Sequence, residues 1–296
     1  MNKQYNFYRK LYFLITAVLC FVVMMSSFAS AYVLTGSQIL ELVVSRLGKA
    51  KNLGIHQKLV LYDEKLEGGT VELDERVNYI FSEVFRSDIK SQKTGKIHIA
   101  SFDQALVILD GKIASTFEGG FDHYKDLFLF KDRMTLQKRL QMLGLNTDLT
   151  RITRYNDRIV YIIGQKTEYG EIHPELYVDK KSLLPIKWVL RGSNLRGEKT
   201  EPLEIVFHDW KKYKKLRLPG RIEFYRNNSL VREITVGKVM INRKLNNNAF
   251  DFEKLKIKYA ASDVKETETK KDENKSDARK TIDGLNKIIE NDQLAF

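Results

Sequence analysis

Between residues 53 and 241 the sequence is a series of short segments rich in β-branched and aromatic residues. Turn-forming residues such as Gly68-Gly69 and Asp110-Gly111 separate them. The segments lie near 55–62, 71–81, 83–91, 96–101, 104–109, 150–155, 158–166, 172–179, 184–192, 203–213, 218–226 and 230–241. Such evenly spaced short strands favour an antiparallel meander over alternating βαβ units. The sequence therefore predicts a mainly β domain of about eleven strands.

Two segments have helical periodicity instead. Thr35 with Gln38 has the spacing of a capping box, and apolar residues then recur at helical spacing over 36–47. A second stretch, 122–143, contains an apolar run around 127–130 and then Leu136 and Leu140 at helical spacing. Two or three helices leave much sheet uncovered. Either the sheet closes on itself, or the helices fill an open barrel and leave a cavity.

Alternation along three of the later strands predicts one apolar face. The residues assigned to it are Ile186, Trp188, Leu190, Ile222, Phe224, Ile234 and Val236. A break in phase at Gly237-Lys238 indicates a β-bulge. These seven side chains belong either to an ordinary core or to the lining of a cavity. An error of one residue in register would move every one of them to the other face.

The N-terminus has the pattern of a signal peptide over residues 1–31. Lys3, Arg9 and Lys10 precede an uncharged stretch, and Ala29 and Ala31 form an A-x-A cleavage site. An uncleaved anchor is the alternative, because the apolar run could span a bilayer. Cys20 is the only cysteine, and it does not follow a small residue, which argues against lipidation at this position. After cleavage the chain would contain no thiol and no disulfide.

The C-terminal residues 259–296 differ in composition from the rest. Residues 261–280 are almost entirely charged or small polar residues, which predicts a disordered linker. Apolar residues at helical spacing from Ala278 to Ile289 then predict a short helix. The expected domains are therefore a signal peptide (1–31), a β domain (32–258) and a linker with a helix (259–296).

Charge and motifs narrow the functional classes. The net charge of +12 allows an anionic membrane surface or an acidic partner, and export makes nucleic acid an improbable partner. The five histidines show no metal-ligand spacing, and the sequence has no P-loop, G-x-S-x-G elbow or dinucleotide fingerprint. We therefore expect a protein that is not an enzyme and that has no catalytic residue, metal or cofactor.

Three stretches resemble the periplasmic lipoprotein-sorting proteins of the LolA type. The first runs from Glu175 to Asp179 and continues through Pro185 to Trp188, where Asp179 suits a tight turn and Pro185 a returning strand. The others lie at 210–225 and 231–250. The resemblance implies an incomplete antiparallel β-barrel with a helical lid, formed here by 36–47 and 122–143, over an apolar cavity.

The resemblance also implies a function. The chain would be a monomeric periplasmic carrier and chaperone that binds acyl chains of lipoproteins or lipids and moves them toward the outer membrane. It would contact inner- and outer-membrane proteins transiently during outer-membrane biogenesis. A regulatory protein that senses lipids or lipoproteins on the same scaffold is the alternative. The seven apolar residues above would line the acyl-chain cavity in either case.

Overall fold

The computed structural model describes residues 14–16, 33–63, 68–91, 95–165, 173–193 and 199–265. The chain divides into two compact units, Met1–Leu34 and Thr35–Phe296. In the first unit Leu14, Ile15 and Thr16 are helical, and most of the predicted signal peptide lies outside the described residues. In the described part of the chain, no helix has both the length and the hydropathy required to span a membrane.

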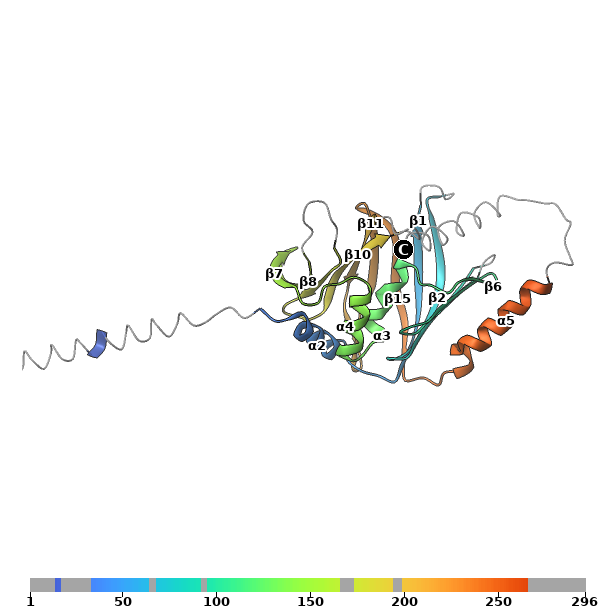
Figure 1. Cartoon of the computed structure of the whole chain (residues 1–296), viewed down its shortest axis with the longest axis horizontal. Coiled ribbons are helices and arrows are strands. Elements are labelled where there is room, and N and C mark those ends of the chain that lie inside the picture. Colours follow the sequence, from blue (N-terminus) through green and yellow to red (C-terminus); the bar gives the residue numbers. More distant parts are fainter. Residues whose placement is uncertain are drawn as a thin grey trace, which may run out of the picture. The chain divides into compact units, whose positions relative to one another are not determined.

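An antiparallel sheet of 13 strands forms most of the second unit (Figure 1). Its first meander contains β1 (Asn52–Tyr62), β2 (Thr70–Ile80), β3 (Val84–Lys90), β4 (Gly95–Ala100), β5 (Ala105–Leu109) and β6 (Lys112–Ser115). The remaining strands are β7 (Thr150–Tyr155), β8 (Arg158–Gly164), β9 (Glu175–Asp179), β10 (Pro185–Ser193), β11 (Lys199–His208), β14 (Arg221–Arg226) and β15 (Ser229–Ile241).

The sheet remains open. Its strand order is β6-β5-β4-β3-β2-β1-β15-β14-β11-β10-β9-β8-β7, so the last strand, β15, joins the two meanders by pairing with β1. The two end strands, β6 and β7, lie at opposite ends of this order and do not pair with each other. The expected incomplete antiparallel barrel is therefore confirmed as a mainly β fold whose large sheet does not close.

Two strands differ from the prediction. The short β6 was not predicted, and the expected strand 203–213 is interrupted after His208. Asp209 has a φ of 54°, in the left-handed region, and ends β11. A separate hairpin of β12 (Lys211–Tyr213) and β13 (Leu216–Leu218) follows. A single left-handed residue is enough to divide an apparently continuous strand, and composition does not indicate it.

The predicted β-bulge is present. Along β1 the pairing moves from Ile55 to Gln57, while along β15 it moves from Val239 to Val236. The additional residue lies at Gly237-Lys238. A Cβ atom at Gly237 would lie 2.7 Å from the carbonyl oxygen of His56, so the close approach of the two strands requires glycine here.

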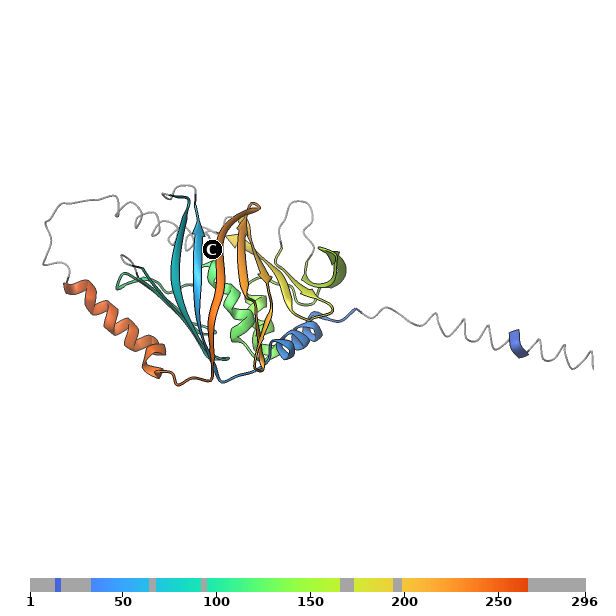
Figure 2. The ribbon, with the colours of Figure 1, turned by 180° about the vertical axis from the view of Figure 1, so that it is seen from behind.

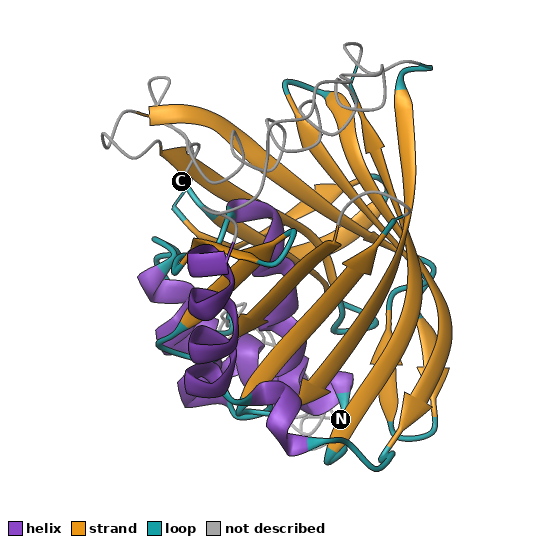
Figure 3. Cartoon of the chain, turned by 90° about the vertical axis from the view of Figure 1, so that its right-hand side faces the viewer, coloured by secondary structure: helices purple, strands orange, loops and turns teal. Residues whose placement is uncertain are grey.

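The helical elements lie before, between and after the strands. They are α2 (Gly36–Leu47), η1 (Gly120–Lys125), α3 (Asp126–Leu129), α4 (Arg133–Met142), η2 (Asn247–Phe250) and α5 (Phe252–Lys265). α2 has the predicted bounds, and both hydrogen bonds of the Thr35–Gln38 capping box are formed. In Figure 1, α3 and α4 lie in front of the sheet, and Figure 3 shows the strands as one curved sheet with helices beside it.

Helix α5 lies beside β6, on the other side of the sheet from α3 and α4 (Figures 1 and 2). Leu255 packs in a cluster with Ile99, Leu106 and Ile108. The side chains of these three residues point to the face of the sheet opposite to α4. Residues 259–265, predicted as the start of the linker, are therefore helical. The rest of the predicted linker and the 278–289 helix lie outside the described residues.

Candidate functional site

One face of the sheet, called the inner face here, is lined by large apolar side chains. Trp188, Ile205 and Phe224 are direct cross-strand partners on β10, β11 and β14, and all three are fully buried. Cross-strand partners point to the same side of a sheet, so these side chains form a continuous row. The inner face is therefore an apolar surface that spans several strands.

The segment 120–142, comprising η1, α3 and α4, covers this face and is called the helical cover. The rings of Phe121 and Tyr124 in η1 each lie 5.7 Å from the ring of Phe224, measured between centroids. Phe128 of α3 contacts Phe207 at 6.0 Å and Trp210 at 6.1 Å. Edge-to-face and tilted contacts of this kind stabilise packing beyond burial alone. The rings of the cover thus occupy the space over the inner face.

Five of the seven predicted lining residues share the inner face and are buried. Ile222 and Phe224 are two residues apart on β14 and therefore lie on the same face. Ile222 is also the cross-strand partner of Ile234. Trp188 and Leu190 are likewise two residues apart on β10, and they pair across the strands with Ile205 and Leu203 of β11 on the same face. The structure thus brings these side chains together. It does not test whether they bind a ligand.

The other two residues are placed differently. The pairing of β10 with β9 shifts between Pro185 and Lys187, and Ile186 packs with Val160 and Ile162 on the face opposite to Trp188. The assignment of Ile186 to the face of Trp188 is therefore corrected, because a bulge interrupts the alternation. Val236 lies beside the bulge of β15 and is only half-buried.

Charged side chains are also buried beneath the helical cover. Lys125 Nζ lies 2.8 Å from Asp126 Oδ1 and also contacts Glu118. Arg139 of α4 contacts the same two carboxylates, with Nε 2.8 Å from Asp126 Oδ2. Both Lys125 and Asp126 have 0% exposed surface. Lys125, Asp126 and Arg139 therefore each have an opposite charge within hydrogen-bonding distance, which offsets the cost of burying them.

A second group of ion pairs connects the cover to the sheet. Asp122 of η1 lies 3.3 Å from Lys96 Nζ and 3.5 Å from His98 Nδ1, both on β4. Its other oxygen lies 3.8 Å from Arg232 Nη1 on β15. His98 Nε2 lies 3.1 Å from Glu118 Oε1. These contacts hold η1 against strands that are far apart in the sequence.

The pKa shifts of the buried side chains indicate that the acidic and basic partners are ionised. Burial by itself would raise the pKa of Glu118, but Lys125 and His98 lower it to about 2. Burial would likewise raise the pKa of Asp122, and the cations around it hold that pKa well below the usual range. Burial would lower the pKa of Lys125, but Asp126 and Glu118 raise it above its ordinary value. Glu118, Asp122 and Lys125 are therefore charged at neutral pH.

Glu118, His123 and Asp126 place possible ligand atoms within 4.8 Å of one another, which raises the question of a metal site. Lys125 and Arg139 already contact both carboxylates. A divalent cation would therefore meet two fixed positive charges at the same oxygens. This set of donors fits an ion-pair cluster and does not fit a metal.

Sequence reasoning missed this cluster. It identified 122–143 as a helical excursion but gave no role to its charges. A signal was present, because Asp122, Lys125 and Asp126 stand within a run that is otherwise rich in apolar residues, from Phe121 to Phe130. Charges inside such a run are either exposed on one face or paired when buried. Their partners Lys96 and Arg232 are distant in sequence, so only the fold could identify them.

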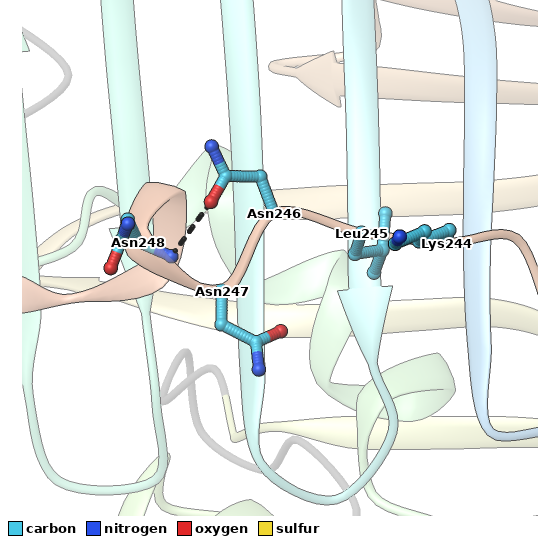
Figure 4. A pocket seen from close by; sticks show the side chains of 5 residues that line it. All are labelled: Lys244, Leu245, Asn246, Asn247 and Asn248. Carbon is cyan, nitrogen blue, oxygen red and sulfur yellow. Dashed lines mark hydrogen bonds between the residues drawn. The ribbon is translucent and has the colours of Figure 1, made fainter.

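An open pocket of about 530 Å³ lies elsewhere, in the segment between β15 and η2 (Figure 4). It is lined by Lys244, Leu245, Asn246, Asn247 and Asn248, and Asn246 accepts a hydrogen bond from the backbone of Asn248. The Asn246 side chain thus caps the first turn of η2. These polar side chains hold a local turn and are separate from the inner face.

An open antiparallel sheet with helices packed on its inner face defines the class: the chain has a LolA-like fold. Two solved structures are similar to it at 12% sequence identity. One is a putative outer membrane lipoprotein-sorting protein domain from Vibrio parahaemolyticus, with a TM-score of 0.51 over 75% of this chain and 98% of that chain. The other is the LolA superfamily protein NE2245 from Nitrosomonas europaea, with a TM-score of 0.52 over 75% and 99%. No protein-family model and no curated protein matches the sequence.

Proposed function

We propose that this chain is a periplasmic carrier that binds acyl chains of lipoproteins or lipids and moves them toward the outer membrane. The observation that carries the proposal is the inner face, where an apolar row across several strands is covered by one continuous helical segment. Removing an acyl chain from water is favourable by about 0.8 kcal/mol per methylene group. A chain of ordinary length could therefore replace the rings of Phe121 and Tyr124 against Phe224.

Two further observations support this proposal. Trp188 Nε1 is buried on the inner face and has no hydrogen-bond partner among the described residues. It is available to an acceptor oxygen such as an ester carbonyl. The LolA-like fold is shared with a putative outer membrane lipoprotein-sorting protein domain. The proposal also requires the N-terminal 31 residues to act as an export signal, as their sequence predicts.

The test uses the purified chain 32–296 and a fluorescent fatty acid, together with native mass spectrometry of the purified protein. We expect uptake of the probe, and slower hydrogen exchange over the cover and the strands that carry Trp188 and Phe224. An absence of uptake would contradict the proposal, as would protection confined to α5 and β3–β6. Transfer of the probe between two vesicle populations then separates a carrier from a sensor, since only a carrier accelerates transfer.

Neighbouring residues on β14 provide matched variants. Phe224→Ser replaces an aromatic ring by a small hydroxymethyl group on the inner face, whereas Tyr225→Ser replaces a ring by the same group on the other face of the strand. We expect the first to weaken uptake and the second to leave it unchanged, provided that both variants retain the circular dichroism spectrum of the wild type. Equal effects would remove the inner face as the binding surface.

A further inference from the structure

Two lysines of the helical cover are buried, but their surroundings differ. Lys125 contacts two carboxylates, as described above. Lys131, in the connection between α3 and α4, is 8% exposed, and its Nζ has no hydrogen-bond partner among the described residues. A buried ammonium without a counter-ion is costly, so such groups are normally paired. Lys131 is therefore an exception that the fold itself does not explain.

The backbone of Lys131 is fixed. Its N–H donates a hydrogen bond to Ser82 Oγ at 3.1 Å, and the N–H of Ser82 donates to the carbonyl of Leu129 at 2.8 Å. These bonds attach the α3–α4 connection to the turn between β2 and β3. The point from which the Lys131 side chain extends is thus fixed beside the β2–β3 turn.

The nearest described partner of the amine is an aromatic ring. Lys131 Nζ lies 4.6 Å from the centroid of the Phe81 ring. Phe81 stacks on Tyr79 at 5.8 Å, and Tyr79 contacts Phe85 edge-on at 5.0 Å. Lys125 Nζ lies 5.7 Å from the Phe85 ring, at the other end of this row. An apolar row therefore leads along the sheet from the paired lysine to the unpaired one.

The pKa of Lys131 is consistent with the absence, among the described residues, of a carboxylate beside its amine. Burial lowers the pKa of Lys131 to about 7, and no carboxylate offsets this effect. Around Lys125 the carboxylates more than offset the same effect. A ligand that brings a negative charge to Lys131 Nζ would restore the missing counter-ion.

We propose that Lys131 Nζ binds the anionic group, a carboxylate or a phosphate, of an acyl ligand whose chain lies along Phe81, Tyr79 and Phe85. This inference rests on the proposed function and adds the chemistry of the ligand's polar end. A cation–π contact of the kind made with Phe81 is weaker than a charge-assisted hydrogen bond to an anion. The amine therefore exchanges a weak partner for a strong one when the ligand enters.

The test compares three twelve-carbon ligands: dodecanoate, dodecyl phosphate and methyl dodecanoate. Their affinities are measured on the chain 32–296 by displacement of a fluorescent fatty acid. We expect wild-type protein to bind at least one of the two anions about tenfold or more tighter than the neutral ester. The preferred anion identifies the source, a fatty-acid carboxylate or a phosphate headgroup. In Lys131→Met the three affinities should become equal, because methionine fills the same space without charge.

Lys138→Met is the matched control, because Lys138 lies on the exposed side of α4 and the change in net charge is the same. It should retain the wild-type preference. An anion preference that persists in Lys131→Met, or is missing in the wild type, overturns the inference while uptake of the ester preserves the proposed function. If none of the three ligands binds, the proposed function fails and this inference fails with it.

A second measurement does not depend on the variant's folding. The wild-type chain is treated with an amine-acylating reagent with and without ligand, and modification of Lys131 is measured by peptide mass spectrometry. We expect the bound anion to reduce modification of Lys131 about tenfold more than the bound methyl ester does. Equal protection by both ligands would assign the effect to covering of the site rather than to ion pairing, and would overturn the inference.

Discussion

At the scale of single residues, the interior beneath the helical cover is defined by how its charges are paired. Lys125 and Arg139 each contact both Glu118 and Asp126, so removal of either cation takes a close counter-ion from both carboxylates. A buried ion pair adds little net stability, but breaking one is strongly destabilising. These residues therefore determine whether the cover can close correctly.

Lys125→Met should lower the free energy of unfolding by about 3–5 kcal/mol, because Glu118 and Asp126 would lose one of their two closest cations. Urea unfolding at pH 7 measures the change. Lys138→Met removes an exposed charge from the same cover and should change the free energy by no more than about 0.5 kcal/mol. Similar values for the two variants would show that the buried pairs have no structural role.

Lys131 predicts a dependence of stability on pH. Its pKa is about 7 in the folded chain, against 10.5 for an ordinary lysine. Below pH 7 both states are protonated, and the cost of burying the charge is fully present. Between pH 7 and 10.5 the unfolded chain binds more protons, so stability rises with pH by up to roughly 1.4 kcal/mol per unit.

Urea unfolding of the wild type and Lys131→Met at pH 6.5 and pH 9 isolates this contribution. The variant should be the more stable of the two at pH 6.5, and the difference should decrease at pH 9. Parallel pH dependences would show that Lys131 keeps its ordinary pKa, and would indicate a counter-ion for its ammonium group in the ligand-free protein.

At the scale of elements, glycines and left-handed residues determine where strands bend and end. Gly237 allows β15 to approach β1 at the bulge, and Asp209 ends β11. Helix α5 covers the face of β3–β5 that the helical cover leaves exposed, through Leu255 and its neighbours. Each element is therefore placed by a few contacts between segments that are far apart in the sequence.

Gly237→Ala should destabilise the fold by about 1–3 kcal/mol, because its Cβ would approach a backbone carbonyl that cannot move independently of β1. Gly95→Ala is the control, since its Cβ would lie 3.8 Å from the nearest atom, the carbonyl oxygen of Ile89. Gly95→Ala should leave the free energy of unfolding almost unchanged. Thermal unfolding of both variants measures the difference, and equal melting temperatures would mean that the bulge tolerates a side chain.

At the scale of the whole molecule, an open sheet with a helical cover over one face allows a direct optical test. The sequence contains two tryptophans, Trp188 on the inner face and Trp210 against Phe128. Trp210 contacts the helical cover directly, and Trp188 lies in the row with Ile205 and Phe224. An acyl chain that lies against Phe224, as proposed above, therefore comes close to Trp188.

In the variant Trp210→Phe, Trp188 is the single tryptophan, and its emission is selected by excitation at a wavelength that tyrosine does not absorb. A fatty acid that carries bromine in its chain should quench most of this emission when it binds, whereas the unbrominated acid should not. Native mass spectrometry measures occupancy independently. Full occupancy without quenching would place the chain away from Trp188 and Phe224 and would contradict binding at that row.

Much of the architecture could be predicted because it depends on local patterns. The capping box of α2, the meander and the bulge at Gly237 each follow from residues adjacent in sequence. Alternation placed Phe224 and Trp188 on one face correctly. It placed Ile186 wrongly, because a shift of one residue in the pairing of β9 and β10 changes the face without changing the composition.

The sequence by itself determined the strands, the first helix and the apolar character of one sheet face, because each depends on periodicity over a few residues. Only the tertiary structure decided which charges are paired. Asp122 meets Lys96 and Arg232 through strands separated by more than a hundred residues, and Lys131 meets no carboxylate within hydrogen-bonding distance among the described residues. Electrostatic pairing depends on distance in space, and that distance is set by the order of strands in the sheet.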